Sequence, residues 1–374
     1  MIVVIADDIS GAAELAGVAR GHGLGAEVQT QFCPDSNAQV VAIDADTRSL
    51  PVDQAVGIVR NLTTTVVGSG KPSWIYKKTD SVLRGHVAAE CHAIAAAAGC
   101  SKILFIPANP GRKRIIRDGN YFVNDVPLHL TEFARDPEYP ASSAHVQDLL
   151  ARCDPETEPT STIEIPDAFT ADHLTEQARR VDGDTLPAGA AEFFAALLQR
   201  NPTRTGEIPA IAEPRSDLVL MVCGSQVGWS TGRGAHCLQH GVPVVPIPRR
   251  LFDDDFREDE LHHWAEEVHH AFCASTKVMI AIGGEKIEGM PPAKLIDRLA
   301  RAVERITKLA TLGSICLEGG ATAIQVMQHL GWSRLQVGKA VSFGLSPMEV
   351  IGKPAPQVYI KPGSYLWPEG IWEL

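Results

Sequence analysis

The segment Lys77–Gly85 concentrates side chains that bind and activate hydroxylated anions. It contains two lysines, an aspartate, a serine and an arginine within eight residues. Arg84 can hold a carboxylate or a phosphate in a two-pronged fork, and Asp80 can accept hydrogen bonds from hydroxyl groups. An apolar run, Trp74–Tyr76, precedes the segment and an alanine-rich run, Val87–Ala98, follows it. This order predicts a strand, a polar turn and a helix, and open α/β sheets bind ligands at such strand ends.

Charged residues also follow two other predicted strands. The apolar run Ile2–Ala6 predicts a buried strand, and the adjacent acids Asp7 and Asp8 follow it, before a helix predicted over residues 13–20. These acids favour a ligand-binding turn, and a solvated turn with a helix cap is the alternative. Val40–Ile43 predicts another strand. Arg48, which follows it, is a candidate anion contact or a surface ion pair of little energetic weight.

Three segments resemble the four-carbon acid sugar kinase family. Lys78–Gly85 is similar to the family's K-x-D-S-T-L-R-G motif, and Ala6–Ala12 is similar to its A-D-D-L-T-G-A opening. Pro107–Pro137, which has little hydrophobic periodicity, resembles a long segment of the family rich in proline and glycine. Members use ATP to phosphorylate acids such as threonate, erythronate or 3-oxo-tetronate. In this chain the matching motifs run in the family's order, from Ala6 to Gly363.

The resemblance implies a substrate site in the first half of the chain. Asp8 or Asp80 would orient the reacting hydroxyl and take its proton, and the sequence leaves the choice between them open. Basic side chains nearby would hold the carboxylate of the acid, although an arginine that braces its own loop is the alternative for Arg112. The predicted substrate-binding residues are Asp7, Arg48, Lys78, Ser81, Arg84, Gly85 and Arg112.

A glycine-rich turn in the second half is typical of a phosphate site. Gly319 and Gly320 follow the apolar run Ser314–Leu317 and precede Thr322, close to a helix predicted over residues 324–330. Backbone N–H groups there can surround a phosphate and the threonine hydroxyl can donate to it, whereas a simple capped turn is the alternative. The family has G-G-x-T-A at this place. The resemblance therefore implies that Gly319, Gly320, Ala321 and Thr322 bind ATP.

Two further positions are assigned to the nucleotide by resemblance alone. The strand predicted over Leu218–Cys223 ends in Gly-Ser, as in the family, which implies a nucleotide contact for Ser225. Gly363 matches the first glycine of the family's K-S-G-x-F-G turn. In this chain a proline replaces the serine and Leu366 replaces the second glycine. Because proline removes a backbone donor, this departure puts the nucleotide preference or the activity in question.

Composition limits the classes of partner. The chain has 374 residues, 45% of them apolar and 21% charged, which is typical of a globular protein long enough for two domains. A net charge of −11 argues against a nucleic-acid partner.

The eight cysteines are scattered and the N-terminus lacks the pattern of a signal peptide, which indicates a cytoplasmic protein without membrane attachment. Histidines 262, 263, 269 and 270 fit a solvated helix face predicted over residues 252–270, so no metal site is predicted.

The sequence therefore predicts an α/β protein of two domains, each with a mainly parallel sheet, and an active-site cleft between them. Residues 1–205 would bind the acid sugar and residues 216–374 would bind ATP with Mg²⁺, joined by a linker within 201–217. The partners would be these small molecules, with a homo-oligomer left open. A weakly active or inactive acid-sugar-binding regulator is the alternative. A dehydrogenase is disfavoured because no strand is followed by G-x-G-x-x-G.

Overall fold

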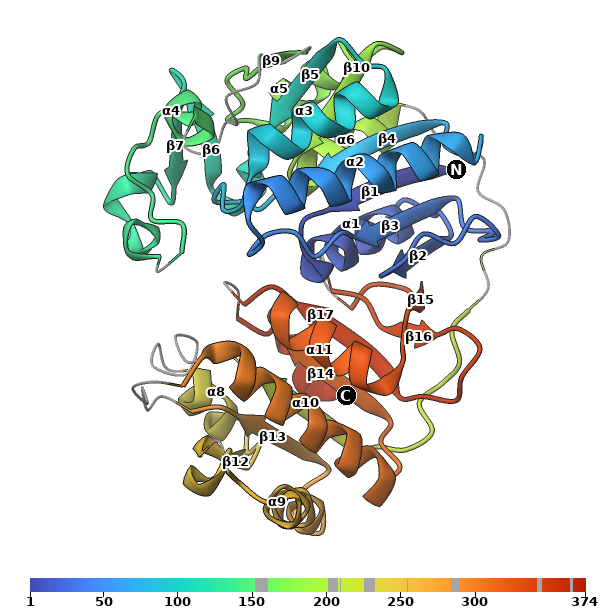
Figure 1. Cartoon of the computed structure of the whole chain (residues 1–374), viewed down its shortest axis with the longest axis vertical. Helices are drawn as coiled ribbons and strands as arrows, with labels where there is room; N and C mark the ends of the chain where they lie inside the picture. Colours follow the sequence, from blue (N-terminus) through green and yellow to red (C-terminus); the bar gives the residue numbers. More distant parts are fainter. Residues whose placement is uncertain are drawn as a thin grey trace. The chain divides into compact units, whose positions relative to one another are not determined.

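The computed structural model describes residues 1–136, 138–151, 161–200, 208, 210–224, 233–253, 255–283, 290–341, 345–363 and 366–374. The chain divides into two compact units, Met1–Ile208 and Pro209–Leu374. Each unit combines helices with mainly parallel strands (Figure 1). The predicted fold class, α/β with mainly parallel sheets, is confirmed. No described helix combines the length and the apolar character that crossing a membrane requires.

The first unit is built on parallel strands whose residues are largely buried. All five residues of β1 and of β3 are buried, because parallel strands between helices are covered on both faces. In spatial order the strands are β2 (Ala26–Gln29), β3 (Val40–Asp44), β1 (Ile2–Ala6), β4 (Trp74–Lys78), β10 (Thr185–Gly189), β5 (Lys102–Ile106) and β9 (Thr162–Glu164).

The connections of the first unit reverse direction between β1 and β4. From β1, the helix α1 (Ile9–Gly21) leads toward β2, whereas α2 (Val52–Gly68) and α3 (Val87–Ala98) lead the opposite way, to β4 and β5. Right-handed crossovers therefore place α1 on one face and the packed pair α2 and α3 on the other (Figure 1). Such a reversal is the topological switch point at which open α/β sheets bind ligands. The remaining helices are α4 (Val146–Ala151), α5 (Ala171–Ala178) and α6 (Ala191–Arg200).

A small antiparallel sheet, for which the sequence pattern gave no prediction, follows β5. It consists of β6 (Arg114–Arg117), β7 (Asn120–Val123) and β8 (Val126–Pro127). The two connecting turns, Asp118-Gly119 and Asn124-Asp125, have positive φ at both residues. This is the type I′ conformation that joins short hairpins, and it favours Asn, Asp and Gly. Three 3-10 segments flank the sheet: η1 (Pro110–Arg112), η2 (Leu128–Leu130) and η3 (Glu132–Arg135).

The strand connections of the second unit also reverse direction, as those of the first unit do. The chain leaves β11 toward β12 through α8, and it leaves β14 in the opposite direction through α11, so the switch point lies between the neighbouring strands β11 and β14. In spatial order the strands are β12 (Val244–Pro246), β13 (Lys277–Ala281), β11 (Val219–Cys223), β14 (Ser314–Glu318), β17 (Gln357–Lys361), β16 (Met348–Val350) and β15 (Arg334–Val337), with β16 antiparallel to both neighbours. The helical segments are α8 (Arg233–Gln239), η4 (Arg249–Phe252), α9 (Glu258–Ala271), α10 (Pro292–Leu309), α11 (Gly320–Leu330) and η5 (Glu369–Glu373).

The helices at the two predicted sites begin earlier than predicted. α1 starts at Ile9 because the side chain of Asp8 accepts a hydrogen bond from the backbone N–H of Gly11 and caps the helix. α11 starts at Gly320, so the glycine-rich turn is part of its first turn. By contrast, α9 starts at Glu258, later than the predicted residue 252.

Candidate active site

Charged residues that follow β1, β3 and β4 meet at the switch point of the first unit. Parallel strands end at the same edge of the sheet, so the turns after them are neighbours. Arg48 lies at the centre: its Nε is 2.8 Å from Oδ2 of Asp7 and its Nη1 is 2.7 Å from Oδ2 of Asp8. Its Nη2 is 3.8 Å from Oδ1 of Asp80. Arg48 therefore holds three aspartates from two turns in one cluster.

Asp8 is fixed by the helix that it caps. Its Oδ1 accepts from the backbone N–H of Gly11 at 2.8 Å, and its Oδ2 accepts from the hydroxyl of Ser10 at 2.8 Å and from Arg48. A Cβ atom on Gly11 would lie 3.1 Å from Oδ1 of Asp8 and 3.2 Å from Cγ of Lys78. Glycine at this position thus allows the turns after β1 and β4 to approach each other closely.

Asp80 and Arg84 form a two-pronged ion pair. Arg84 donates from Nη2 to Oδ1 at 2.8 Å and from Nε to Oδ2 at 3.0 Å, and the backbone N–H of Val82 also donates to Oδ2. Burial by itself would raise the pKa of Asp80, but the guanidinium groups of Arg84 and Arg48 outweigh it and hold that pKa well below its usual value. Asp80 is therefore a carboxylate at every physiological pH.

Glu14, which the sequence analysis did not select, joins two of the predicted cations. Its Oε2 is 3.3 Å from Nζ of Lys78 and its Oε1 is 3.1 Å from Nη1 of Arg112. Lys78 and Glu14 are both buried. The available sequence signal was that Glu14 is the one charged residue between positions 9 and 19, in a helix otherwise rich in alanine and glycine.

Ser81 and Gly85 shape the turn after β4. Arg114 donates to the hydroxyl of Ser81, and the hydroxyl of Tyr121 donates to the backbone carbonyl of Ser81 at 2.6 Å. These contacts attach the turn to the small antiparallel sheet. Gly85 has φ +83°, and a Cβ there would lie 3.5 Å from the Arg48 side chain. Space would allow a Cβ atom at this contact distance, so it is the positive φ that favours glycine.

Asp44, at the end of β3, is a second residue that the sequence analysis missed. Its Oδ1 accepts from the backbone N–H of Asp46 at 2.9 Å, while its buried Oδ2 has no hydrogen-bond partner among the described residues. Burial raises the pKa of Asp44 well above its usual value, and the nearby carboxylates of Asp46 and Asp8 add to the effect. Among carboxyls of the same edge, Asp44 and Asp80 thus have pKa values displaced in opposite directions.

Glycines gather around Thr322 at the switch point of the second unit. A Cβ on Gly224, just after β11, would lie 2.1 Å from Oγ1 of Thr322, so only glycine leaves room there. Gly319 has φ +91° and donates from its backbone N–H to the carbonyl of Lys361 at 2.8 Å. A Cβ on Gly363 would lie 3.8 Å from Cα of Gly319. The turns after β11, β14 and β17 therefore meet here, with Gly320 and Ala321 opening α11.

Pro362 does not prevent the end of β17 from contacting the end of β14. Nζ of Lys361 lies 3.4 Å from Oε2 of Glu318, at the end of β14, and donates to the carbonyl of Pro362 at 3.1 Å. Both side chains of the ion pair are buried. Leu366 is 62% exposed, so its side chain does not pack into the glycine cluster. Ser225, the remaining predicted nucleotide contact, lies outside the described residues.

Two family models match the two halves of the chain separately. Residues 2–200 match the family model described as a sugar-binding N-terminal domain, and residues 220–365 match a nucleotide-binding C-terminal domain. The chain is 32% identical to a D-threonate kinase of Salmonella typhimurium, over 88% of this chain and 86% of that protein. It is 28% identical to a D-threonate kinase of Cupriavidus necator (99% and 96%) and 25% identical to a 3-oxo-tetronate kinase of Methylobacterium radiotolerans (96% and 95%).

A solved structure also shares the fold. A Salmonella typhimurium protein, provisionally described as a tRNA synthase, superposes with a TM-score of 0.78, covering 100% of this chain and 98% of that one at 18% identity. This likeness concerns the fold alone. The two domain models together span most of the sequence, and the family predicted from the motifs is confirmed. The chain belongs to the four-carbon acid sugar kinase family, with its sugar-binding N-terminal and nucleotide-binding C-terminal domains.

Proposed function

We propose that this protein is an ATP-dependent kinase that phosphorylates the terminal hydroxyl of a four-carbon acid sugar of the threonate, erythronate or 3-oxo-tetronate class. One observation carries the proposal: each unit has a switch point, and the residues at the two switch points suit the two substrates. Cations and carboxylates follow β1, β3 and β4, whereas glycines and a threonine follow β11, β14 and β17. The relatives named as threonate and 3-oxo-tetronate kinases support this acceptor class.

The carboxylate of the acid would bind beside Arg84, Lys78 and Arg112. Arg48 is the least suitable of the predicted contacts, because its guanidinium already holds two aspartates at 2.8 Å or less. Its role would be to fix these aspartates in place. Arg84 shares its guanidinium with Asp80 but remains 27% exposed at the side chain, so it can also face a ligand. Hydroxyl groups of the acid would donate to the aspartates of the cluster.

The glycine cluster of the second unit fits the phosphates of ATP. Glycine at position 224 leaves room for the buried hydroxyl of Thr322, which any larger residue would displace, and α11 directs its first N–H groups toward the same turn. When bound, Mg²⁺ would neutralise charge on the phosphate oxygens and be held chiefly by them and by water. Gly320, Ala321 and Thr322 would donate to the phosphate oxygens, and Gly319 would line the site with its N–H bound to the carbonyl of Lys361. No protein ligand is assigned to the metal.

Asp8 is the better candidate for receiving the proton of the reacting hydroxyl. The two-pronged pair with Arg84 helps to hold the pKa of Asp80 low, and this lowered pKa makes Asp80 a weak proton acceptor. We therefore assign Asp80 the task of orienting Arg84 and the substrate hydroxyls.

Placement of both substrates in one interdomain cleft stays a prediction. The use of ATP, and the fact that the seven cysteines among the described residues form no disulfide, favour a reducing, cytoplasmic setting.

The proposal is tested by measuring ADP release over a panel of four- and five-carbon sugar acids with Mg-ATP. We expect release with at least one of D-threonate, D-erythronate and 3-oxo-tetronate, and a phosphorylated acid detectable by mass spectrometry. The five-carbon acids and glycerol serve as controls for acceptor size and for the need of a carboxylate. Binding of an acid without ADP release for any panel member would favour the regulatory alternative and contradict a kinase.

A further inference from the structure

Three side chains of types that can bind metals converge in the second unit, and none of them belongs to the glycine cluster. His236 lies on α8, His240 follows one helical turn later, and Glu369 lies on η5 near the C-terminus. One ligand atom of each residue lies within 4.8 Å of the ligand atoms of the other two. Residues four apart on a helix share one face, so the two imidazoles can bind one ion together. The third ligand comes from a segment distant in sequence.

Stacking with Trp372 holds the two imidazole rings in place. The ring of His240 lies parallel to the Trp372 indole, with centroids 4.4 Å apart and an interplanar angle of 6°. His236 meets the same indole edge to face at 5.4 Å and meets the ring of His240 at 4.8 Å. Because Trp372 belongs to η5, the same segment that supplies Glu369 also sets the planes of both histidines. Fixed ring orientation is what outer partners commonly provide for histidine ligands of metals.

We propose that His236, His240 and Glu369 bind a divalent first-row transition-metal ion of the Zn²⁺ type. Imidazole together with carboxylate suits Zn²⁺, Ni²⁺ or Co²⁺, whereas Mg²⁺ prefers sites made of oxygen alone. Bonds of about 2.0 Å in a tetrahedron place ligand atoms roughly 3.3 Å apart. The observed limit of 4.8 Å is wider, but Glu369 is exposed and can turn toward the two rings. The fourth position is left to water.

The site uses other residues than the phosphate chemistry proposed above. No residue of the glycine cluster contributes to it, and its ligands differ in kind from those of Mg²⁺. An ion bound there would connect α8 to η5, and α8 is the first helix that the structure describes after β11 and Gly224. We therefore expect bound metal to stabilise the second unit whether or not the chain is catalytically active.

The test is Zn²⁺ binding to the full chain, freed of any affinity tag and of bound metal, measured by isothermal titration and by the rise in Tm. We expect one Zn²⁺ per chain. The double variant His236→Ala/His240→Ala and the single variant Glu369→Gln should each weaken binding by at least about tenfold. Co²⁺ in place of Zn²⁺ should give the strong visible absorption of a four-coordinate site in the wild type and not in these variants.

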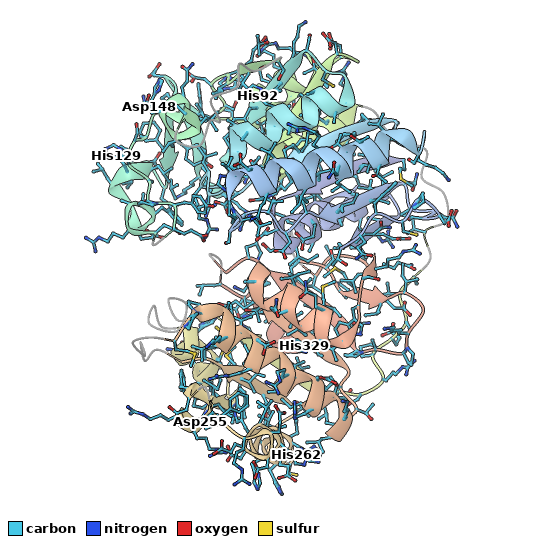
Figure 2. The ribbon with its side chains drawn as sticks, in the orientation of Figure 1. His92, His129, Asp148, Asp255, His262 and His329 are labelled. Carbon is cyan, nitrogen blue, oxygen red and sulfur yellow. The ribbon has the colours of Figure 1, made fainter. Side chains whose placement is uncertain are left out.

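A matched control removes two other histidines. His262 and His263 lie on α9, both exposed, and His262 is labelled in Figure 2. The variant His262→Ala/His263→Ala should keep the wild-type affinity and the rise in Tm. Equal losses in this control and in the His236/His240 variant would indicate non-specific binding and overturn the site. Stoichiometric binding that survives in the His236/His240 variant, or unchanged affinity in Glu369→Gln, would overturn the three-ligand arrangement. Circular dichroism without metal checks that each variant is folded.

Discussion

At the scale of single residues, Arg48 explains why several carboxylates can lie together at the switch point of the first unit. Three aspartates in one buried cluster would repel each other, and at least one would be protonated at neutral pH. The guanidinium of Arg48 contacts all three and, together with Lys77, lowers the pKa of Asp7 against the effect of burial. The carboxylates are therefore arranged before a substrate arrives, as catalysis by preorganised charges requires.

Single substitutions of Asp8 and Asp80 distinguish which of the two accepts the proton and which orients the substrate. Asp8→Asn should lower kcat about 100-fold or more, the size of a lost general base. Asp80→Asn should mainly raise the KM for the acid, because Arg84 loses the partner that holds it. Steady-state kinetics over a range of pH distinguish the two effects. Wild-type kcat in Asp8→Asn would refute the assignment.

Asp80 and Asp44 should change the stability of the protein with pH in opposite directions. The pKa of Asp80 is lowered on folding, so its stabilising contribution is complete above the unfolded value of about 3.9 and is lost as the pH falls through the folded pKa. The pKa of Asp44 is raised, so its contribution is complete below about 3.9 and is lost as the pH rises through the folded pKa.

Urea unfolding between pH 3 and pH 8 measures both contributions. Relative to wild type, Asp80→Asn should be destabilised at pH 7 and should approach wild type as the pH falls below about 4. Asp44→Asn should instead gain stability relative to wild type as the pH rises from about 4. Each variant is the control for the other, since both remove one buried carboxylate. The same pH trend in both would contradict the two pKa displacements.

Glu14 should act on acid binding through the two cations that it holds. In Glu14→Gln, Lys78 and Arg112 lose the charge that fixes their positions, so the KM for the acid should change several-fold while the KM for ATP stays constant. Steady-state kinetics with each substrate varied in turn provide the measurement. Glu164→Gln, which alters an exposed glutamate of the same unit, is the control. An equal change for both substrates would place Glu14 outside the acid site.

At the scale of elements, the second unit depends on close approach of the turns after β11 and β14. A Cβ at position 224 would lie 2.1 Å from the hydroxyl of Thr322. Gly224→Ala should therefore displace Thr322 or the turn and weaken ATP binding by about tenfold, measured by titration calorimetry with a non-hydrolysable ATP analogue. Gly370→Ala is the control, because a Cβ there meets its nearest neighbour at 3.9 Å. Wild-type nucleotide affinity in Gly224→Ala would remove this turn from the nucleotide site.

The elements also show what the sequence could and could not predict. Turns after β1, β4 and β14 were predictable because polar residues interrupt apolar runs in the chain itself. The small antiparallel sheet was missed, although Asp118-Gly119 and Asn124-Asp125 are the residue pairs that type I′ turns favour. The contact of Glu14 with Lys78 and that of Gly224 with Thr322 depend on packing between elements far apart in sequence. Local patterns do not contain such information.

At the scale of the whole molecule, we propose that each domain binds one of the two substrates. This division predicts that substitutions in one domain leave the other substrate's binding intact. Arg84→Ala should raise the KM for the acid at least about tenfold and leave the KM for ATP within about twofold, as expected when a charged hydrogen bond is lost. Thr322→Val should do the reverse. Arg180→Ala, at an exposed ion pair of the first unit, is the control. Equal effects of either active-site variant on both substrates would contradict the division.

A crystal structure of the protein with ADP and a four-carbon acid that the kinase accepts tests this division most directly. We expect the β-phosphate of ADP to contact the backbone of residues 319–322 and the hydroxyl of Thr322. We expect the carboxylate of the acid to contact Arg84 or Lys78, with a hydroxyl near Asp8. A nucleotide bound at the ends of β1 and β4, or an acid bound away from them, would contradict the proposed assignment of substrates to domains.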